Sequence, residues 1–226
     1  MSTLSKLESM ADASENGEPR DVEESAHEED EDRLSPETAA RRQAALARLR
    51  TFGDPALRTK AKEVTSFDDS LTEEVARMGQ LMSDALGVGL AATQLGVMHR
   101  LLIYRTGSGA PLVAVVNPRI EWASDEKESA EEGCLSLPGV VLDVERSVHL
   151  RVGASDEQGE DITIEASGLD ARVLQHEIDH LDGVLILDRV AREERKEALR
   201  ILREGPSEPD AGEAEPAESS ASGSTI

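Results

Sequence analysis

The chain has a single cysteine, no long hydrophobic run and few basic side chains, and each shortage excludes a class of protein. Cys134 has no second cysteine to pair with, so the fold does not depend on an intrachain disulfide. No stretch has the length and apolarity of a signal peptide or a membrane span. We therefore expect a soluble cytoplasmic protein in a reducing compartment, where a thiolate is available as a metal ligand.

The shortage of positive charge is greatest at the two ends of the chain. The net charge is -23, and residues 1–37 hold 13 acidic and 3 basic side chains, while residues 204–226 hold 6 acidic and no basic ones. Neither end carries an aromatic residue that could help to form a core. We predict disordered acidic tails over 1–37 and 205–226 around one folded domain over 38–204. Such tails repel nucleic acid, so we expect no DNA binding; a solubilising role needs no specific partner.

Helix signals appear in the first half of the domain. Ser35-Pro36 is a cap followed by a first-turn proline, which predicts a helix over 37–50. Ser70 and Glu73 have the spacing of a capping box, and the apolar residues that follow share one face of a helix that ends at Gly87. The small residues of 87–94 then let the backbone approach another group closely. A phosphate-binding loop is the alternative, but no Gly-Lys-Ser/Thr follows.

The sequence predicts several strands followed by a helix in the second half of the domain. Alternating or β-branched patterns predict strands over 101–105, 112–116, 140–144, 148–152 and 162–164. We expect Pro118 and the polar run 124–129 to end the first pair of strands, and a helix over 188–204 to close the domain. The order of elements predicts an α+β fold, with antiparallel β-sheets packed around a central helix carrying His-Glu-x-x-His, a helix in the N-terminal half and a C-terminal helix.

The central helix carries the clearest chemical signal. His176 and His180 stand four residues apart, about one helical turn, so both imidazoles can bind one metal ion with Glu177 beside it. Gly168 and Gly183 bound an apolar-periodic run that contains both histidines. A surface helix that happens to carry two histidines is the alternative.

The third metal ligand must come from elsewhere in the chain. Ile186 occupies the position where the longer zinc-protease motif has a third histidine. The candidates are His27 in the acidic tail, His99 and His149 in strand-like runs, and Cys134. Soft thiolate and imidazole donors favour Fe²⁺, Co²⁺, Ni²⁺ or Zn²⁺ over Mg²⁺ or Ca²⁺.

Three segments together resemble one family. Gly87-Val-Gly-Leu-Ala-Ala-Thr-Gln94, Glu132-Gly-Cys-Leu-Ser136 and Gln175-His-Glu-Ile-Asp-His180 are similar, in order and without mismatch, to the signatures of the peptide deformylases. The similarity spans roughly residues 45–204 and leaves both tails out. It implies a hydrolase that removes the N-formyl group from the N-terminal formyl-methionine of nascent polypeptides and releases formate.

The resemblance also implies the roles of individual residues. Cys134, His176 and His180 would hold one ion, physiologically Fe²⁺, with Zn²⁺, Ni²⁺ or Co²⁺ as replacements. A metal-bound hydroxide would attack the formyl carbon, with Glu177 as general base and then general acid. The side-chain amide of Gln94 and the backbone N–H of Leu135 would stabilise the oxyanion.

Residues around the predicted centre are candidates for substrate binding. We expect Gly87, Val88 and Gly89 of the first segment, with Leu169 and Val173 on the face of the histidine helix, to border an apolar pocket for the methionine side chain. Each apolar residue can equally be ordinary core. The chain departs from the family near Val141, where many members carry a basic residue that helps to hold the peptide backbone.

The C-terminal helix suggests a partner. A basic stripe along it consists of Arg189, Arg192, Lys196, Arg200 and Arg203. In the resembling bacterial enzymes a C-terminal helix docks on the ribosome, so the stripe is a candidate for binding ribosomal RNA. A solvated amphipathic helix is the simpler interpretation, and neighbouring glutamates dilute the charge.

Two other functional classes share features with a formyl-peptide hydrolase, and Cys134 has a second possible role. A His-Glu-x-x-His metallopeptidase would not need the Cys134 and Gln94 segments. A catalytically silent binding module would usually have lost Glu177 or a ligand, and this chain keeps them. Cys134 could instead be a nucleophile, but both nearby histidines would already be committed to the metal.

Overall fold

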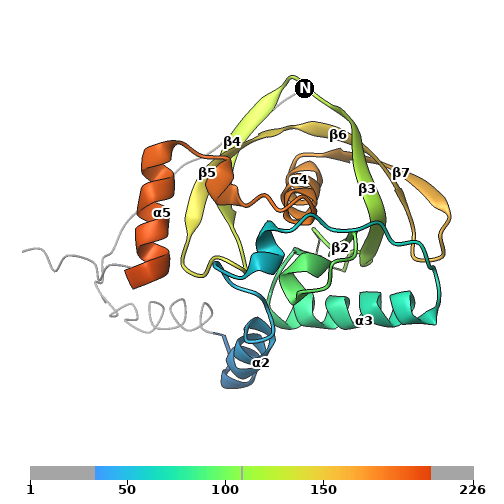
Figure 1. Ribbon diagram of the computed structural model, residues 1–226, viewed down its shortest axis with the longest axis horizontal. Helices are drawn as coiled ribbons and strands as arrows, with labels where there is room; N and C mark the ends of the chain where they lie inside the picture. The colour runs from blue at the N-terminus through green and yellow to red at the C-terminus, as the bar shows by residue number, and fades with distance from the viewer. Residues whose placement is uncertain (1–33, 108, 205–226) are drawn as a thin grey trace, which may run out of the picture.

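The computed structural model describes residues 34–107 and 109–204, which form an α+β fold (Figure 1). The helices are α2 (Pro36–Leu46), α3 (Asp69–Asp84), α4 (Leu169–Leu181) and α5 (Arg192–Glu204), with short 3-10 turns η1 (Pro55–Arg58), η2 (Ala92–Leu95) and η3 (Ile186–Asp188). The strands are β1 (Gly89–Ala91), β2 (Leu101–Tyr104), β3 (Val113–Ala123), β4 (Lys127–Gly133), β5 (Val141–Ser147), β6 (His149–Ser155) and β7 (Asp161–Ser167).

The strands form two antiparallel sheets. The larger has the order β1-β2-β3-β6-β7, and the smaller is the hairpin of β4 and β5. Helix α4 contacts β1, β2 and β7 of the larger sheet and β5 of the smaller one. Figure 1 shows α4 inside the arch of strands, with α3 running below it and α5 on the outer side of β5. The histidine helix is therefore held by both sheets.

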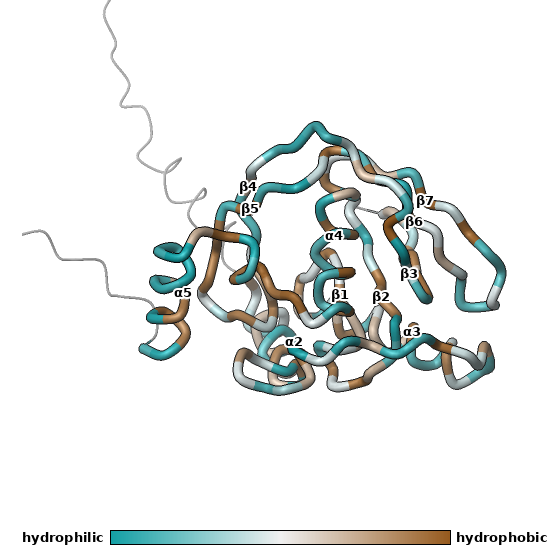
Figure 2. The backbone as a smooth tube through the Cα atoms, turned by 45° about the horizontal axis from the view of Figure 1, so that its top comes forward, coloured by the Kyte–Doolittle hydropathy of each residue, from teal (hydrophilic) through white to brown (hydrophobic). Residues whose placement is uncertain are grey.

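The core has one layer on each side of the larger sheet and a third beside the hairpin. Leu101 and Ile103 of β2 face the cluster formed with α3, and Leu102 between them faces the cluster formed with α4. This division follows from the period-two alternation of a strand buried on both faces, and Figure 2 shows hydrophobic residues along β2. The third cluster joins β5 to α5 through the buried Ala198.

Two local predictions from the sequence are wrong, and a third is correct only in part. Helix α3 begins at Asp69 and its N-cap is Asp68, whose Oδ1 accepts the N–H of Ser70, so Ser70 does not head a capping box. Strand β3 continues past Pro118 because the chain bulges there, with Asn117 at φ 54°. The polar run 124–129 does end the strand pair, because β3 stops at Ala123, but from Lys127 it already forms β4, which is largely exposed and which the sequence did not predict.

The described part of the chain includes the last four residues of the predicted N-terminal tail. Pro36 and Glu37 belong to α2 and Ser35 is its N-cap, whereas residues 1–33 and 205–226 of the predicted tails lie outside the described ranges. Within those ranges, no helix combines the length and apolarity required to cross a membrane. The domain boundaries at 38 and 204 stay a prediction.

Candidate functional site

Three possible metal donors come together at the centre of the fold. One ligand atom from each of Cys134, His176 and His180 lies within 4.8 Å of the others. The Sγ of Cys134 is 3.2 Å from Nε2 of His180, and the two imidazole rings are 5.0 Å apart between centroids. Ion-to-ligand distances of about 2.0–2.3 Å place neighbouring donors of one tetrahedral ion roughly 3.5 Å apart. The set therefore fits one soft divalent ion, and three protein ligands are the number typical of a catalytic site.

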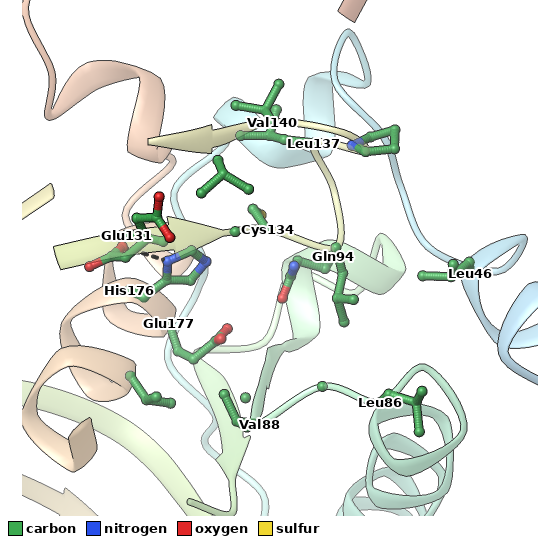
Figure 3. Close-up of a pocket in the computed structure, with 18 of the residues that line it drawn as sticks. Leu46, Leu86, Val88, Gln94, Glu131, Cys134, Leu137, Val140, His176 and Glu177 are labelled. Carbon is green, nitrogen blue, oxygen red and sulfur yellow. Dashed lines mark hydrogen bonds and ion pairs between the residues drawn. The ribbon is translucent and has the colours of Figure 1, made fainter. Parts of the chain in front are cut away.

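A buried carboxylate orients His176. Oε2 of Glu132 lies 3.0 Å from Nδ1 of His176, which leaves Nε2 as the ring atom available to a metal (Figure 3). Glu132 is itself held by Arg146, at 3.0 and 2.9 Å, and by Arg172 at 2.8 Å. Burial acts to raise the pKa of Glu132, but the hydrogen bonds from His176 and Arg146 outweigh it and lower the pKa to about 2. Glu132 is therefore an anion at neutral pH.

The same network ties the histidine helix to its surroundings. Asp179 of α4 accepts Nη1 of Arg146 at 2.6 Å and Nε of Arg189 at 3.0 Å. On the same helix, the amide of Gln175 bonds both backbone groups of Ser147, donating to its carbonyl at 2.9 Å and accepting its N–H at 3.2 Å. These polar contacts fix the position of helix α4.

Glu177 lies buried against the first glycine-containing segment. A Cβ atom on Gly89 would stand 2.5 Å from Oε1 of Glu177, so only glycine leaves room for this carboxyl. Oε2 of Glu177 has no hydrogen-bond partner among the described residues. Burial raises the pKa of Glu177 to about 7, although His176 acts to lower it. A carboxyl that changes protonation near neutral pH is suited to accept a proton and release it again.

Gln94 and Leu135 present hydrogen-bond donors near the same centre. Oε1 of Gln94 accepts the N–H of Ala91 at 2.9 Å, and Nε2 donates to Oγ of Ser136 at 3.2 Å, so the orientation of the amide is fixed. One hydrogen of Nε2 stays available. The N–H of Leu135 makes no hydrogen bond within the described part of the chain. Both groups can stabilise negative charge that develops beside Cys134.

The remaining histidines lie elsewhere. His99 pairs with Glu74 at 2.8 Å, and His149 bonds Ser167 at 2.8 Å, so neither contributes to the metal centre. His27 is outside the described residues. Of the candidates for a third donor, Cys134 is the one that the structure brings to His176 and His180.

Two of the three donors, Cys134 and His176, line a cleft of about 760 Å³, and His180 is buried behind them. The substrate-binding candidates from the sequence all line it: Gly87, Val88, Gly89, Leu169 and Val173. Val88 and Leu169 are about half exposed, whereas Val173 is buried. Val141 also lines the cleft and carries no charge, so the departure from the family leaves an apolar, exposed side chain there.

Sequence reasoning missed the polar network behind the ligands. Arg146 follows Leu142 and Val144 on the inward face of β5, and this period-two pattern could have placed it inside the fold. Glu132 stands two residues before Cys134, but nothing in the sequence shows that it turns toward His176. Asp179 carries no local signal that separates it from a solvent-exposed helix position.

The basic stripe is partly engaged within the protein. Arg189 pairs with Asp179, and Arg200 pairs with Glu197 and Glu204. Arg203 donates to the carbonyl of Leu199. Arg192 and Lys196 are exposed. The stripe therefore presents less free positive charge than the sequence alone predicts.

Comparisons with known proteins agree on one family. The profile described as Polypeptide deformylase matches residues 46–196. A peptide deformylase of Thermotoga neapolitana is 48% identical over 157 residues, which cover 70% of this chain and 92% of that protein. The peptide deformylase of Acidothermus cellulolyticus is 44% identical over 160 residues, covering 71% and 87%.

Solved structures show the same likeness. A peptide deformylase from Synechococcus elongatus in complex with actinonin superposes with a TM-score of 0.65 at 44% identity, over 67% of this chain and 85% of that one. The enzyme from Thermotoga maritima gives 0.62 at 46% identity, over 64% and 97%.

Proposed function

Because this chain belongs to the peptide deformylase family, we propose that it removes the formyl group from formyl-methionyl peptides at the Cys134–His176–His180 centre, in the cytoplasm. The family establishes the activity, which is hydrolysis of the N-formyl group of nascent peptides. The observation that supports this assignment of residues is the convergence of a thiol and two imidazoles beside a buried glutamate.

Cys134, His176 and His180 would hold one divalent ion, and Fe²⁺ is our proposal for its identity. When bound there, such an ion would polarise the formyl carbonyl and lower the pKa of a water molecule. Soft sulfur and imidazole donors also accept Zn²⁺, Ni²⁺ and Co²⁺. Glu132 keeps His176 in the orientation that exposes Nε2.

Glu177 moves the proton in the proposed reaction. It takes one proton from the attacking water at Oε1 or Oε2 and passes it to the nitrogen of methionine as the C–N bond breaks, so that a free amine and formic acid result, and the acid then loses its proton to solvent as formate. Gln94 through Nε2 and Leu135 through its N–H donate to the oxygen of the formyl carbonyl as negative charge forms on it. Removal of one such donor typically lowers the rate by about 10²- to 10³-fold.

The apolar walls of the cleft bind the methionine side chain in this proposal. Val88, Leu169 and Val173 offer hydrocarbon surface beside the reacting centre. A Cβ on Gly87 would stand 3.1 Å from Leu135 and one on Gly89 would stand 2.5 Å from Glu177, so these two glycines let the wall of the cleft approach the reacting centre closely.

A formate-release assay tests the assignment. Protein purified without oxygen should release formate from formyl-Met-Ala-Ser, and Glu177→Gln should lose nearly all activity while it keeps its metal. Metallopeptidase activity would instead cleave internal peptide bonds, and a silent relative would release nothing. Equal formate release by the wild type and Glu177→Gln would remove Glu177 from its assigned role.

Ribosome docking through α5 is a second proposal, supported by the exposure of Arg192 and Lys196 on the helix surface. Positive side chains at this face would meet ribosomal RNA phosphates. Reversal of the charges of Arg192, Lys196 and Arg203 should then weaken co-sedimentation with ribosomes. Unchanged co-sedimentation would reject this role of the stripe.

A further inference from the structure

Helix α2 forms part of the cleft although nearly all of it precedes the matched family region. The family match begins at residue 46, and α2 spans Pro36–Leu46. Two of its residues, Arg42 and Leu46, line the cleft. They are four residues apart, so they share one face of the helix. Figure 3 draws Leu46 on the side of the pocket opposite His176, with Gln94 between them.

Helix α2 is anchored to the segments that carry the oxyanion donors. Just after the helix, the N–H of Arg50 donates to the carbonyl of Gln94 at 2.7 Å, and the N–H of Phe52 donates to the carbonyl of Ser136 at 3.0 Å. Ala45 and Leu49 are buried in the cluster formed with α3. The position of Arg42 relative to the reacting centre is therefore set by the fold.

Arg42 brings an uncompensated cation to the cleft. Arg172, the other arginine in the lining, is bound to Glu132. Arg42 is exposed, and its guanidinium forms no ion pair or hydrogen bond within residues 34–107 and 109–204. A guanidinium recognises a carboxylate through two parallel hydrogen bonds, which an apolar or amide side chain cannot match in charge. Leu46 and Leu86, which also line the cleft, offer apolar contact to the methylene groups of a substrate side chain that ends in a carboxylate.

We propose that Arg42 of α2 is a specificity-determining residue that favours substrates with a carboxylate side chain among the residues that follow formyl-methionine. The inference rests on the proposed function, because that function places the formyl end of the peptide at Cys134 and Glu177. The following residues then run along the cleft toward Arg42 and Leu46. Arg42 takes no part in bond cleavage, so its effect should be confined to substrates long enough to reach it.

The test uses full-length, metal-loaded protein and formyl-Met peptides with amidated C termini, which carry no terminal carboxylate. In a formyl-Met-Ala-Ala-Ala-amide series, Glu, Gln or Lys replaces each alanine in turn, and formate release gives kcat and KM. At one position, we expect kcat/KM to be about two- to fivefold higher for Glu than for Gln, because an exposed ion pair contributes about that much to binding. The difference should lie mainly in KM. Added salt should reduce it.

Two variants and one control assign the preference to Arg42. Arg42→Gln should abolish it, and Arg42→Glu should reverse it so that Lys becomes the favoured residue. Arg41→Gln is the matched control, because Arg41 is the neighbouring exposed arginine on the same helix but does not line the cleft. It should keep the wild-type preference.

Other outcomes overturn the proposal in distinguishable ways. A preference for Glu that survives in Arg42→Gln, or no preference at any position, contradicts it while the proposed function stands. An equal loss for the short substrate formyl-Met-Ala-amide and for the longer peptides would show that Arg42 only supports the fold. Absence of formate from every peptide, including the short one, would reject the proposed function itself.

Discussion

Oε2 of Glu132 accepts a hydrogen bond from Nδ1 of His176 at 3.0 Å, and this contact links a metal-ligand candidate to a buried charge network. Two arginines, Arg146 and Arg172, hold the same carboxylate. The ring of His176 therefore has one orientation before any ion arrives, which reduces the cost of assembling the site.

Replacement of this carboxylate should weaken metal binding. Glu132→Gln keeps the shape but removes the charge, and we expect a loss of about 10- to 100-fold in metal affinity, measured by competition with a chromophoric chelator. Stability should also fall by about 3–5 kcal/mol, because Arg146 stays buried with part of its compensation removed. Glu145→Gln on β5 is the control, since Glu145 pairs with Lys127 at the surface. Wild-type metal affinity in folded Glu132→Gln would contradict the positioning role.

Gly89 should be intolerant of even one added methyl group. A Cβ there would stand 2.5 Å from Oε1 of Glu177, so Gly89→Ala must displace the carboxyl from its position. We expect kcat to fall by about 10²-fold or more, because general acid–base catalysis contributes at least that factor. Metal content, measured by atomic absorption, should not change.

Gly133→Ala provides the matched comparison for Gly89. Gly133 also lines the cleft, but its added Cβ would meet no atom within 4 Å. Activity close to the wild type is expected. If both variants lost activity equally, the close approach of Gly89 to Glu177 would not explain the effect.

Much of the site could be predicted from the sequence because its residues occur in short motifs. The spacing of His176 and His180 fixes their shared helix face before any tertiary structure is known. Cys134 was one of four candidates for the third donor, and residue spacing alone could not choose among them. That choice depends on how the β4–β5 hairpin folds against α4, which is a contact between distant parts of the chain.

The features that the sequence could not predict depend on burial and packing, which only the tertiary structure shows. Strand β4 is largely exposed, so it lacks the alternation of apolar and polar residues that indicates a strand. Asp68 and Ser70 are both good caps, and local sequence does not decide between them. Arg42 lies on an ordinary basic helix in the sequence, and only the packing of α2 beside the cleft gives it a role.

Leu86 combines backbone strain with a place in the cleft. Its φ is 60°, in the left-handed region that costs a non-glycine residue about 1–2 kcal/mol, and its side chain is half exposed. We expect Leu86→Gly to raise the free energy of unfolding by about 1 kcal/mol in urea denaturation, after allowance for the greater freedom of glycine when unfolded. The same variant should lower kcat/KM by about fivefold for peptides with a leucine after formyl-methionine, because roughly 1 kcal/mol of apolar contact is lost.

A second variant separates the two effects at Leu86. Asparagine tolerates the left-handed region better than leucine but offers no apolar surface. Leu86→Asn should therefore also be more stable than the wild type, with the same loss for leucine-containing peptides. A variant that becomes less stable would show that Leu86 contributes packing that outweighs its strain.

Asp188 should make stability depend on pH in the acid range. Burial acts to raise its pKa, but hydrogen bonds from Arg58 and from the N–H of Leu185, with the charge of Arg195, bring the pKa below its ordinary value of 3.8. Because the folded-state pKa is below the unfolded one, the stabilisation is present above 3.8 and is lost as the pH falls through the folded value. Asp188→Asn should thus lower the free energy of unfolding by about 1 kcal/mol at neutral pH, which is the upper end of the range for partly exposed ion pairs. Below pH 3.8 this loss should become progressively smaller.

Urea denaturation of the two proteins across the acid range measures this difference. Asp161→Asn is the control, because Asp161 is exposed and forms no ion pair in the described part of the chain. The free energy of unfolding of Asp161→Asn should differ little from that of the wild type. This difference should not shrink below pH 3.8 as the difference for Asp188→Asn does. Asp188 joins η3 to Arg58 of η1 and to Arg195 of α5, so its loss should loosen the packing of α5 against β5. A difference for Asp188→Asn that stayed constant down to about pH 3 would mean that the carboxyl stabilises the fold by shape alone and not through its charge.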